Sequence, residues 1–190
     1  MRWVLGTVLG LVLVCSSVRA DLNPQQLASF RLDRFPALQG FQASRPGSWR
    51  VALLHDRPSQ ATATLNCRYF HGPTEISYTV LLFPRRSALE EWDRLVREST
   101  PAWFTPLKAR AKGGVQERML GGLILPSQSR GRAAVVRQMV ITLRPHQHAE
   151  MIRRNPGSRS KLLSGAELSQ RVDRVWAELL RLAKALPANR

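Results

Sequence analysis

Two histidines separated by one residue, His146 and His148, are the sharpest candidates for chemistry in this sequence. On an extended segment they would point the same way, and imidazole nitrogens are ligands for zinc, copper or nickel. Cys67 and His71 could supply further ligands. Protein metal sites need three or four ligands, however, and no Cys-x-x-Cys or His-Glu-x-x-His motif accompanies the pair. A metal site at His146 and His148 is therefore an alternative to two solvated histidines beside Arg144, which the ligand count favours.

The residues of a hydrolytic site are also sparse. A catalytic triad needs a nucleophile, a base and an orienting acid, and the sequence contains no nucleophile elbow. His55 and Asp56 are adjacent in a predicted turn, where neighbouring side chains point apart more often than together. The sequence therefore favours a non-catalytic protein without a cofactor. A small metal-dependent or hydrolytic enzyme is the alternative.

Positive charge is the most prominent binding feature, because 29 basic residues stand against 13 acidic ones, for a net charge of +16. Fixed positive charge on exposed loops attracts anionic partners to a degree that salt reduces. Two basic segments are predicted to be such loops, and whether they adjoin in space does not follow from the sequence. The predicted binding residues are Arg144, Arg153, Arg154, Arg159 and Lys161 on one loop, and Lys108, Arg110 and Lys112 on the other.

The first 20 residues are typical of an export signal. Arg2 precedes an apolar run from Val4 to Cys15, and Val-Arg-Ala at 18–20 resembles a small-residue cleavage site. The run is shorter than the roughly 20 residues that span a bilayer. We expect cleavage after Ala20; an uncleaved N-terminal anchor and acylation of Cys15 are the alternatives.

Export places the mature chain, 21–190, in the periplasm, a lumen or the extracellular space. Cleavage removes two arginines and no acid, which leaves 27 basic and 13 acidic residues and a net charge of +14. A nucleic-acid partner is not expected there, so we predict an acidic protein, an anionic envelope or membrane surface, or another polyanion. No other stretch is long and apolar enough to be a transmembrane helix.

A hairpin predicted over 61–83 is the element around which the rest of the chain is organised. Its arms alternate apolar and polar residues, as half-buried strands do, and the turn is His71-Gly72-Pro73-Thr74. Cys67, the one cysteine left after cleavage, lies on the apolar side of its arm. We expect it to be a small buried hydrophobe there, since it has no disulfide partner within the chain.

Two helices are predicted from capping boxes, in which a serine is followed three residues later by a glutamate. Ser87 begins a helix over about 87–99, and Ser164 begins a longer helix that Pro187 ends. The second helix has a continuous apolar stripe at helical spacing. That stripe contains Leu168, Val172, Val175, Trp176, Leu179, Leu182, Ala183 and Leu186.

Further strands are predicted at 49–54, 115–125 and 133–143, and 144–161 is predicted to be an exposed loop with one helical turn near 149–153. Residues 21–48 form an irregular segment whose apolar residues should pack on the sheet. The mature chain is predicted to be a single α+β domain. It should contain a mainly antiparallel, twisted sheet of about five strands with two amphipathic helices packed against it, the second C-terminal.

Overall fold

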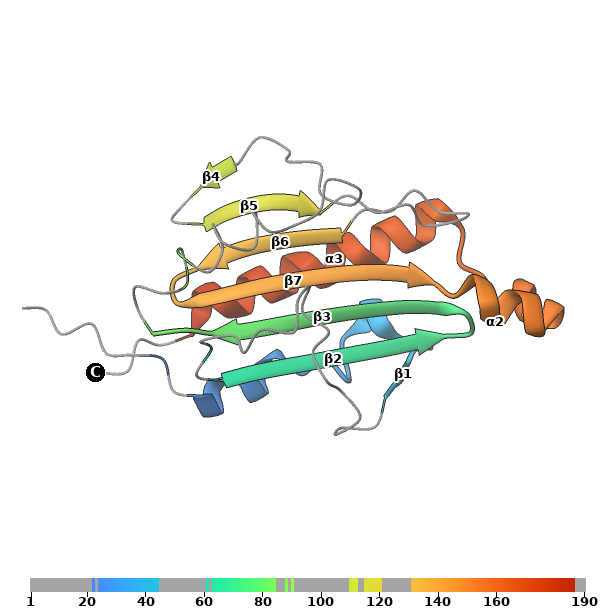
Figure 1. The fold of residues 1–190 in the computed structure, drawn as a ribbon, viewed down its shortest axis with the longest axis horizontal. Coiled ribbons are helices and arrows are strands. Elements are labelled where there is room, and N and C mark those ends of the chain that lie inside the picture. The colour runs from blue at the N-terminus through green and yellow to red at the C-terminus, as the bar shows by residue number, and fades with distance from the viewer. Residues whose placement is uncertain are drawn as a thin grey trace, which may run out of the picture.

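The computed structural model describes residues 22, 24–44, 61, 63–84, 88, 90, 110–112, 115–120 and 131–186. Within these ranges the chain forms an antiparallel sheet with a long C-terminal helix, shown in Figure 1. The α+β class, the antiparallel sheet and the C-terminal helix are as predicted. Strand 49–54 and most of helix 87–99 lie outside the described residues, although Ala88 and Glu90 are helical.

The sheet has seven strands in the order β1-β2-β3-β7-β6-β5-β4. Five of them are six to nine residues long, and β1 and β4 are short strands at the two edges. Every pairing is antiparallel. The strands are β1 (Gln42–Ala43), β2 (Ala63–His71), β3 (Thr74–Leu82), β4 (Arg110–Lys112), β5 (Val115–Leu120), β6 (Gly131–Val136) and β7 (Met139–Gln147).

The predicted hairpin is β2 and β3, which pair in register from Ala63↔Leu82 to His71↔Thr74. Gly72 and Pro73 form a two-residue turn, in which Gly72 has φ +55°. A positive φ at the first central position suits the right-handed twist of the flanking strands, and glycine adopts it without a steric penalty. The hairpin and its turn are confirmed.

Helix α3 (Gly165–Ala185) covers one face of the sheet and contacts β6 and β7 (Figure 1). The Ser164 hydroxyl accepts a hydrogen bond from the Glu167 backbone N–H at 3.1 Å, which confirms the predicted N-cap. The predicted stripe is the buried side of the helix: Leu168, Val175, Leu179 and Ala183 are fully buried, and Val172 and Trp176 nearly so. Hydrophobic burial against the sheet therefore stabilises this helix.

The N-terminal segment packs on the same core through two short 3-10 helices, η1 (Pro24–Phe30) and η2 (Pro36–Leu38). Phe30, Leu32 and Leu38 are buried, as predicted for the apolar residues of this segment. The hydroxyl of Tyr78 donates to the Phe30 carbonyl at 2.6 Å, so the buried tyrosine hydroxyl has a hydrogen-bond partner.

The other face of the sheet has two regions. At one end Leu81, Phe83, Ala88 and Val140 form a second, smaller apolar cluster together with alanine and valine from β6. At the other end, where β3 begins and β7 finishes, the same face carries polar and charged side chains from β2, β3 and β7. Strand alternation places those residues opposite the core that α3 covers.

Two features of the second strand region differ from the prediction. A single strand over 133–143 is wrong: Arg137 and Gln138 make a tight turn between β6 and β7, and Arg137 has φ +54°. The prediction missed this turn because it contains neither glycine nor proline. Gln138 is tied to the N-terminal segment, since its side-chain oxygen accepts from the Leu22 backbone N–H at 3.0 Å.

Strand β7 also runs further than predicted, through Pro145 to Gln147. Pairing with β3 continues to Gln147, whereas pairing with β6 ends at Arg132↔Leu143. Beyond Leu143, β7 is therefore an edge strand on that side within the described part of the sheet. Proline is tolerated there because no ladder hydrogen bond to β6 requires its missing N–H.

Candidate functional site

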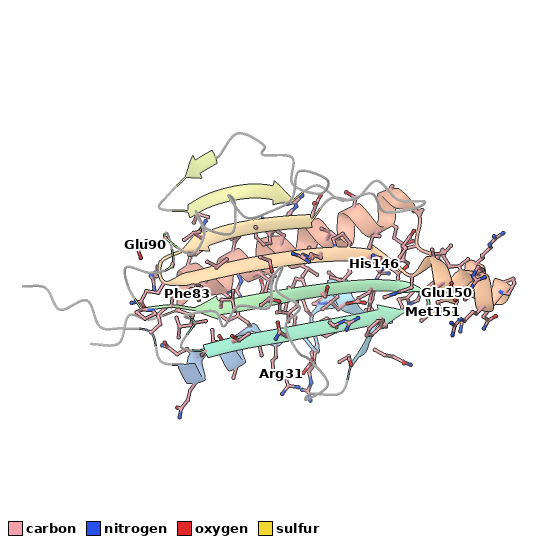
Figure 2. All side chains as sticks on the ribbon, in the orientation of Figure 1. Arg31, Phe83, Glu90, His146, Glu150 and Met151 are labelled. Carbon is pink, nitrogen blue, oxygen red and sulfur yellow. The ribbon has the colours of Figure 1, made fainter. Side chains whose placement is uncertain are left out.

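The segment after β7 forms a compact, highly charged projection. It consists of α2 (Ala149–Arg154) and η3 (Pro156–Lys161), and we call residues 149–161 the basic arm. Figure 1 shows α2 extending beyond the strand ends at one end of the sheet, and Figure 2 shows Glu150 and Met151 upon it. The basic arm has four cationic side chains and one carboxylate, for a net charge of +3.

The two arginines of α2 are exposed cations of the basic arm. The side chains of Arg153 and Arg154 are 76% and 77% exposed. Both bind Glu150: Arg153 donates from Nε and one Nη at 2.9 and 2.8 Å, and Arg154 donates from Nε at 2.7 Å. Since a guanidinium has five N–H donors, most of the donors of both arginines remain available to a partner. Arg159 and Lys161 are also exposed.

Both ends of the basic arm are fastened to the β2–β3 turn. At its start, the His148 backbone N–H donates to the Pro73 carbonyl at 2.8 Å. At its end, Lys161 packs so closely on Gly72 that a Cβ atom at residue 72 would lie 2.7 Å from the Lys161 Cβ. Inside it, Ser158 is buried and its hydroxyl donates to the Asn155 carbonyl at 2.6 Å. The cations are therefore presented by an anchored scaffold.

A charged cluster on the face of the sheet opposite α3 provides the third attachment of the basic arm. We call Arg68, Phe70, Glu75, His146 and His148 the sheet cluster. The Glu75 side chain is only 5% exposed and accepts hydrogen bonds from the side chains of Arg68 and His148. Arg68 binds it in bidentate fashion through Nε and Nη2, and His148 Nε2 lies 2.7 Å from its Oε2. His148, the N-cap residue of α2, thus joins the arm to the sheet.

Ring contacts complete the sheet cluster. His146 and His148 meet edge to face with ring centroids 4.5 Å apart, and Phe70 lies 6.1 Å from His148. The Arg68 guanidinium stands 5.3 Å above the Phe70 ring, within the range of a cation–π interaction. Figure 2 places His146 where β7 approaches α2.

The electrostatics of the sheet cluster follow from this geometry. Burial alone would raise the pKa of Glu75, but hydrogen bonds from Arg68 and His148 outweigh it and hold that pKa below its usual value. Burial, and then the neighbouring His148, lower the pKa of His146. Glu75 is therefore an ionised acceptor whose oxygens are already occupied, and His146 favours its neutral form.

Of the five cations predicted on the loop 144–161, one lies on a strand instead. Arg144 lies in β7 opposite Ser77, whose hydroxyl donates to the Arg144 carbonyl at 3.2 Å. Its side chain is half-buried on the sheet, and desolvation lowers its pKa. The loop prediction for this residue was wrong because β7 continues past Pro145. The other four cations of that predicted loop, Arg153, Arg154, Arg159 and Lys161, lie together on the basic arm.

The second predicted basic group does not join the first. Arg110 and Lys112 lie in β4, the edge strand separated from β7 by β5 and β6, and not in a loop. Lys112 pairs with Val115, which pairs with Val136 at the end of the sheet away from the basic arm. Lys108 lies outside the described residues.

The alternative metal ligands are also separated by the fold. His146 and His148 are in contact, but strand alternation puts Cys67 and His71 on the opposite face, where His71 Nδ1 bonds to the Gly40 carbonyl at 3.0 Å. Among the described residues no group of three or more histidine, cysteine, aspartate or glutamate side chains could hold a metal ion. Cys67 is half-buried against the core, and burial raises the pKa of its thiol.

Two pockets in the described part of the chain lie away from the basic arm. One, of about 120 Å³, is lined by residues that include Asp33, Cys67, Arg68 and Tyr69. The other, of about 280 Å³, lies between η2 and α3. Both are smaller than ordinary small-molecule sites, which measure roughly 300–1,000 Å³. No described helix is long and apolar enough to cross a membrane.

Comparison with known proteins adds no further assignment, because no family model, curated protein or solved structure matches this chain.

Sequence reasoning missed Glu75 and Arg68, although the hairpin contained the necessary signal. The two-residue turn fixes the register, so Arg68 pairs with Ser77 and Phe70 with Glu75. That register places a cation and a carboxylate on the same face as diagonal neighbours, which is within reach of an arginine side chain.

Proposed function

We propose that this protein is an exported, non-catalytic binding protein of the cell envelope, and that the basic arm binds an anionic partner. The observation that carries the proposal is the concentration of four cations on one anchored projection at the end of the sheet. Arg153, Arg154, Arg159 and Lys161 are all exposed, and only Glu150 opposes their charge.

Preorganisation supports binding through this projection. Fastening of both ends to the β2–β3 turn reduces the conformational entropy that a loop would lose on binding. The arm also extends beyond the strand ends (Figure 1), so a partner can approach it from that end of the sheet.

Export is the second part of the proposal, and its support comes from residues 1–20 and from the start of the core. Leu22 is buried and its backbone N–H is hydrogen-bonded to Gln138, so the described core begins just after the proposed cleavage site. Cleavage after Ala20 would keep Leu22 and this hydrogen bond.

The test replaces Arg153, Arg154, Arg159 and Lys161 with glutamine and measures retention of the exported protein on dextran sulfate. A matched control replaces four exposed cations elsewhere, at Arg34, Arg174, Arg181 and Lys184, and removes the same total charge. If the basic arm binds by charge, the first variant should lose most of its retention on dextran sulfate and the control should lose little.

The loss should be greatest at low salt and should shrink toward physiological salt, where the screening length is about 8 Å. Circular dichroism should show both variants folded. Equal losses in the two variants would assign the attraction to net charge alone, and retention unaffected by either would refute the proposal.

A further inference from the structure

We infer that the anionic partner of the basic arm is a lipid bilayer rich in anionic headgroups, and that Met151 enters its apolar layer while the surrounding cations bind lipid phosphates. This inference rests on the proposed function and names the chemistry of its partner.

Met151 is the observation that separates a lipid surface from other polyanions. It is 42% exposed, and among the residues whose side-chain burial the structure describes it is the one large hydrophobic residue exposed to this degree. The other large apolar side chains whose burial the structure describes are buried or half-buried. A polysaccharide has no apolar layer to receive such a side chain, whereas a bilayer has one directly beneath its phosphates.

The position of Met151 relative to the charges fits a bilayer. Arg154 follows it by three residues, so the two side chains are neighbours on the surface of α2. Arg154 donates to Glu150 only through its Nε–H, and Arg153 donates through two of its five N–H groups. The other N–H groups of both arginines can therefore donate to phosphate oxygens. Arg159 and Lys161 supply two more cations from η3.

The shape of the molecule permits this contact. Figure 2 shows Met151 and Glu150 on the helix that extends past the sheet, so a flat surface can reach this helix from beyond the strand ends. Glu150 is the only carboxylate in the arm, and it is already paired with both arginines. Glu75, the acid of β3, is ionised but buried, and its bidentate pairing with Arg68 offsets its charge toward an approaching membrane.

The expected affinities follow from the number of charges. Each cation near an anionic bilayer contributes about fivefold, so removal of all four should weaken binding by at least roughly 100-fold at low salt. Insertion of the exposed part of Met151 should contribute about three- to eightfold more, because that part is 42% of its surface.

The experiment measures co-sedimentation of the exported protein with vesicles of mixed phosphatidylglycerol and phosphatidylcholine, and with vesicles of phosphatidylcholine alone. Binding is expected only to the mixed vesicles. Met151→Ser should weaken it by the stated three- to eightfold without changing retention on dextran sulfate, and Met151→Leu should bind as the wild type does. The quadruple Gln variant should lose binding to both, and the Arg34, Arg174, Arg181 and Lys184 control should keep most of it.

Insertion itself is tested with a fluorescent probe of polarity attached at residue 151, in the M151C variant of a Cys67→Ser background. Its emission should shift to the blue with mixed vesicles and stay unchanged with inorganic phosphate or dextran sulfate. An unshifted probe, or a Met151→Ser variant that binds vesicles as well as the wild type, would overturn the inference.

The two proposals fail in different ways. Retention on dextran sulfate through the arm, without binding to mixed vesicles, would overturn the lipid inference and leave the proposed function standing. Loss of both would overturn the proposed function as well.

Discussion

Replacement of Glu75 by glutamine is the most informative perturbation of the sheet cluster. It keeps the size of the side chain and removes its charge. Glu75 accepts two hydrogen bonds from Arg68 and one from His148, and each hydrogen bond to a charged group contributes about 1.5–3 kcal/mol. The net loss is smaller than their sum, because the substitution also removes the cost of burying a carboxylate.

Partial exposure of the two partners reduces the loss further. The side chains of Arg68 and His148 are 33% and 29% exposed, so water can replace part of what they lose. We therefore expect Glu75→Gln to lower the free energy of unfolding by about 2 kcal/mol at neutral pH, which for a domain of this length is about 4–8 °C in the melting temperature.

The dependence on pH gives the sharper test. The folded-state pKa of Glu75 lies below its unfolded value of about 4.3, so its contribution is fully present above that value. The contribution is lost as the pH falls through the folded pKa, where the carboxylate becomes protonated. The melting temperatures of wild type and Glu75→Gln should therefore differ at about pH 7 and converge toward about pH 2.

Thermal unfolding followed by circular dichroism across this range is the assay, with Glu150→Gln as the control. Glu150 is also held by two arginines but is 52% exposed, so its replacement should change the melting temperature far less. Equal melting temperatures of wild type and Glu75→Gln at neutral pH would refute the reasoning. A difference that persists undiminished in acid would attribute the effect to altered packing and not to charge.

Four further predictions concern the core, the turn, the arm and the N-terminus. Trp176→Ala should lower the free energy of unfolding by about 3–5 kcal/mol because Trp176 is only 2% exposed, and an unchanged melting midpoint would contradict its place in the core. Gly72→Ala should destabilise by at least about 1 kcal/mol, since residue 72 has a positive φ and a Cβ there would meet Lys161, and Gly157→Ala should cost less. Glu150→Gln should strengthen binding to anionic vesicles, because it removes the one negative charge of the basic arm; weaker binding would show that Glu150 is needed to orient the arginines. Mass spectrometry of the exported protein should find Asp21 at the N-terminus, whereas an intact Met1 or an acylated Cys15 would exclude cleavage after Ala20.

Local patterns in the sequence were enough for the parts of the fold that depend on neighbouring residues. Alternation and the Gly72-Pro73 turn predicted the β2–β3 hairpin, because register in a two-residue hairpin follows from the turn itself. Ser164, Glu167 and the apolar stripe predicted α3, its start and its buried side, because caps and helical periodicity are local properties. The α+β class followed from the order of these elements.

The β6–β7 turn and the end of β7 needed tertiary information. Arg137 adopts its positive φ where Gln138, next to it, is held by Leu22 from the far end of the chain, and nothing in the local sequence indicates that contact. Pro145 fits in β7 because it lies beyond the pairing of β7 with β6, which in the described sheet ends at Arg132↔Leu143. A strand boundary of this kind depends on a neighbour that is distant in sequence.

The candidate site was also predictable from the sequence only in part. The order of residues in the sequence showed four cations close together in 153–161. Because they are neighbours in the chain, a basic projection there could be predicted. Only the tertiary structure showed that Arg144 lies in the sheet and that β4 is its far edge strand. It also showed that Cys67 lies on the face opposite His146. It also brought Glu75 from β3 under His148 from the end of β7. The physical reason is that strand pairing joins residues that are 73 positions apart in the chain, and their charges can interact only once the sheet has formed.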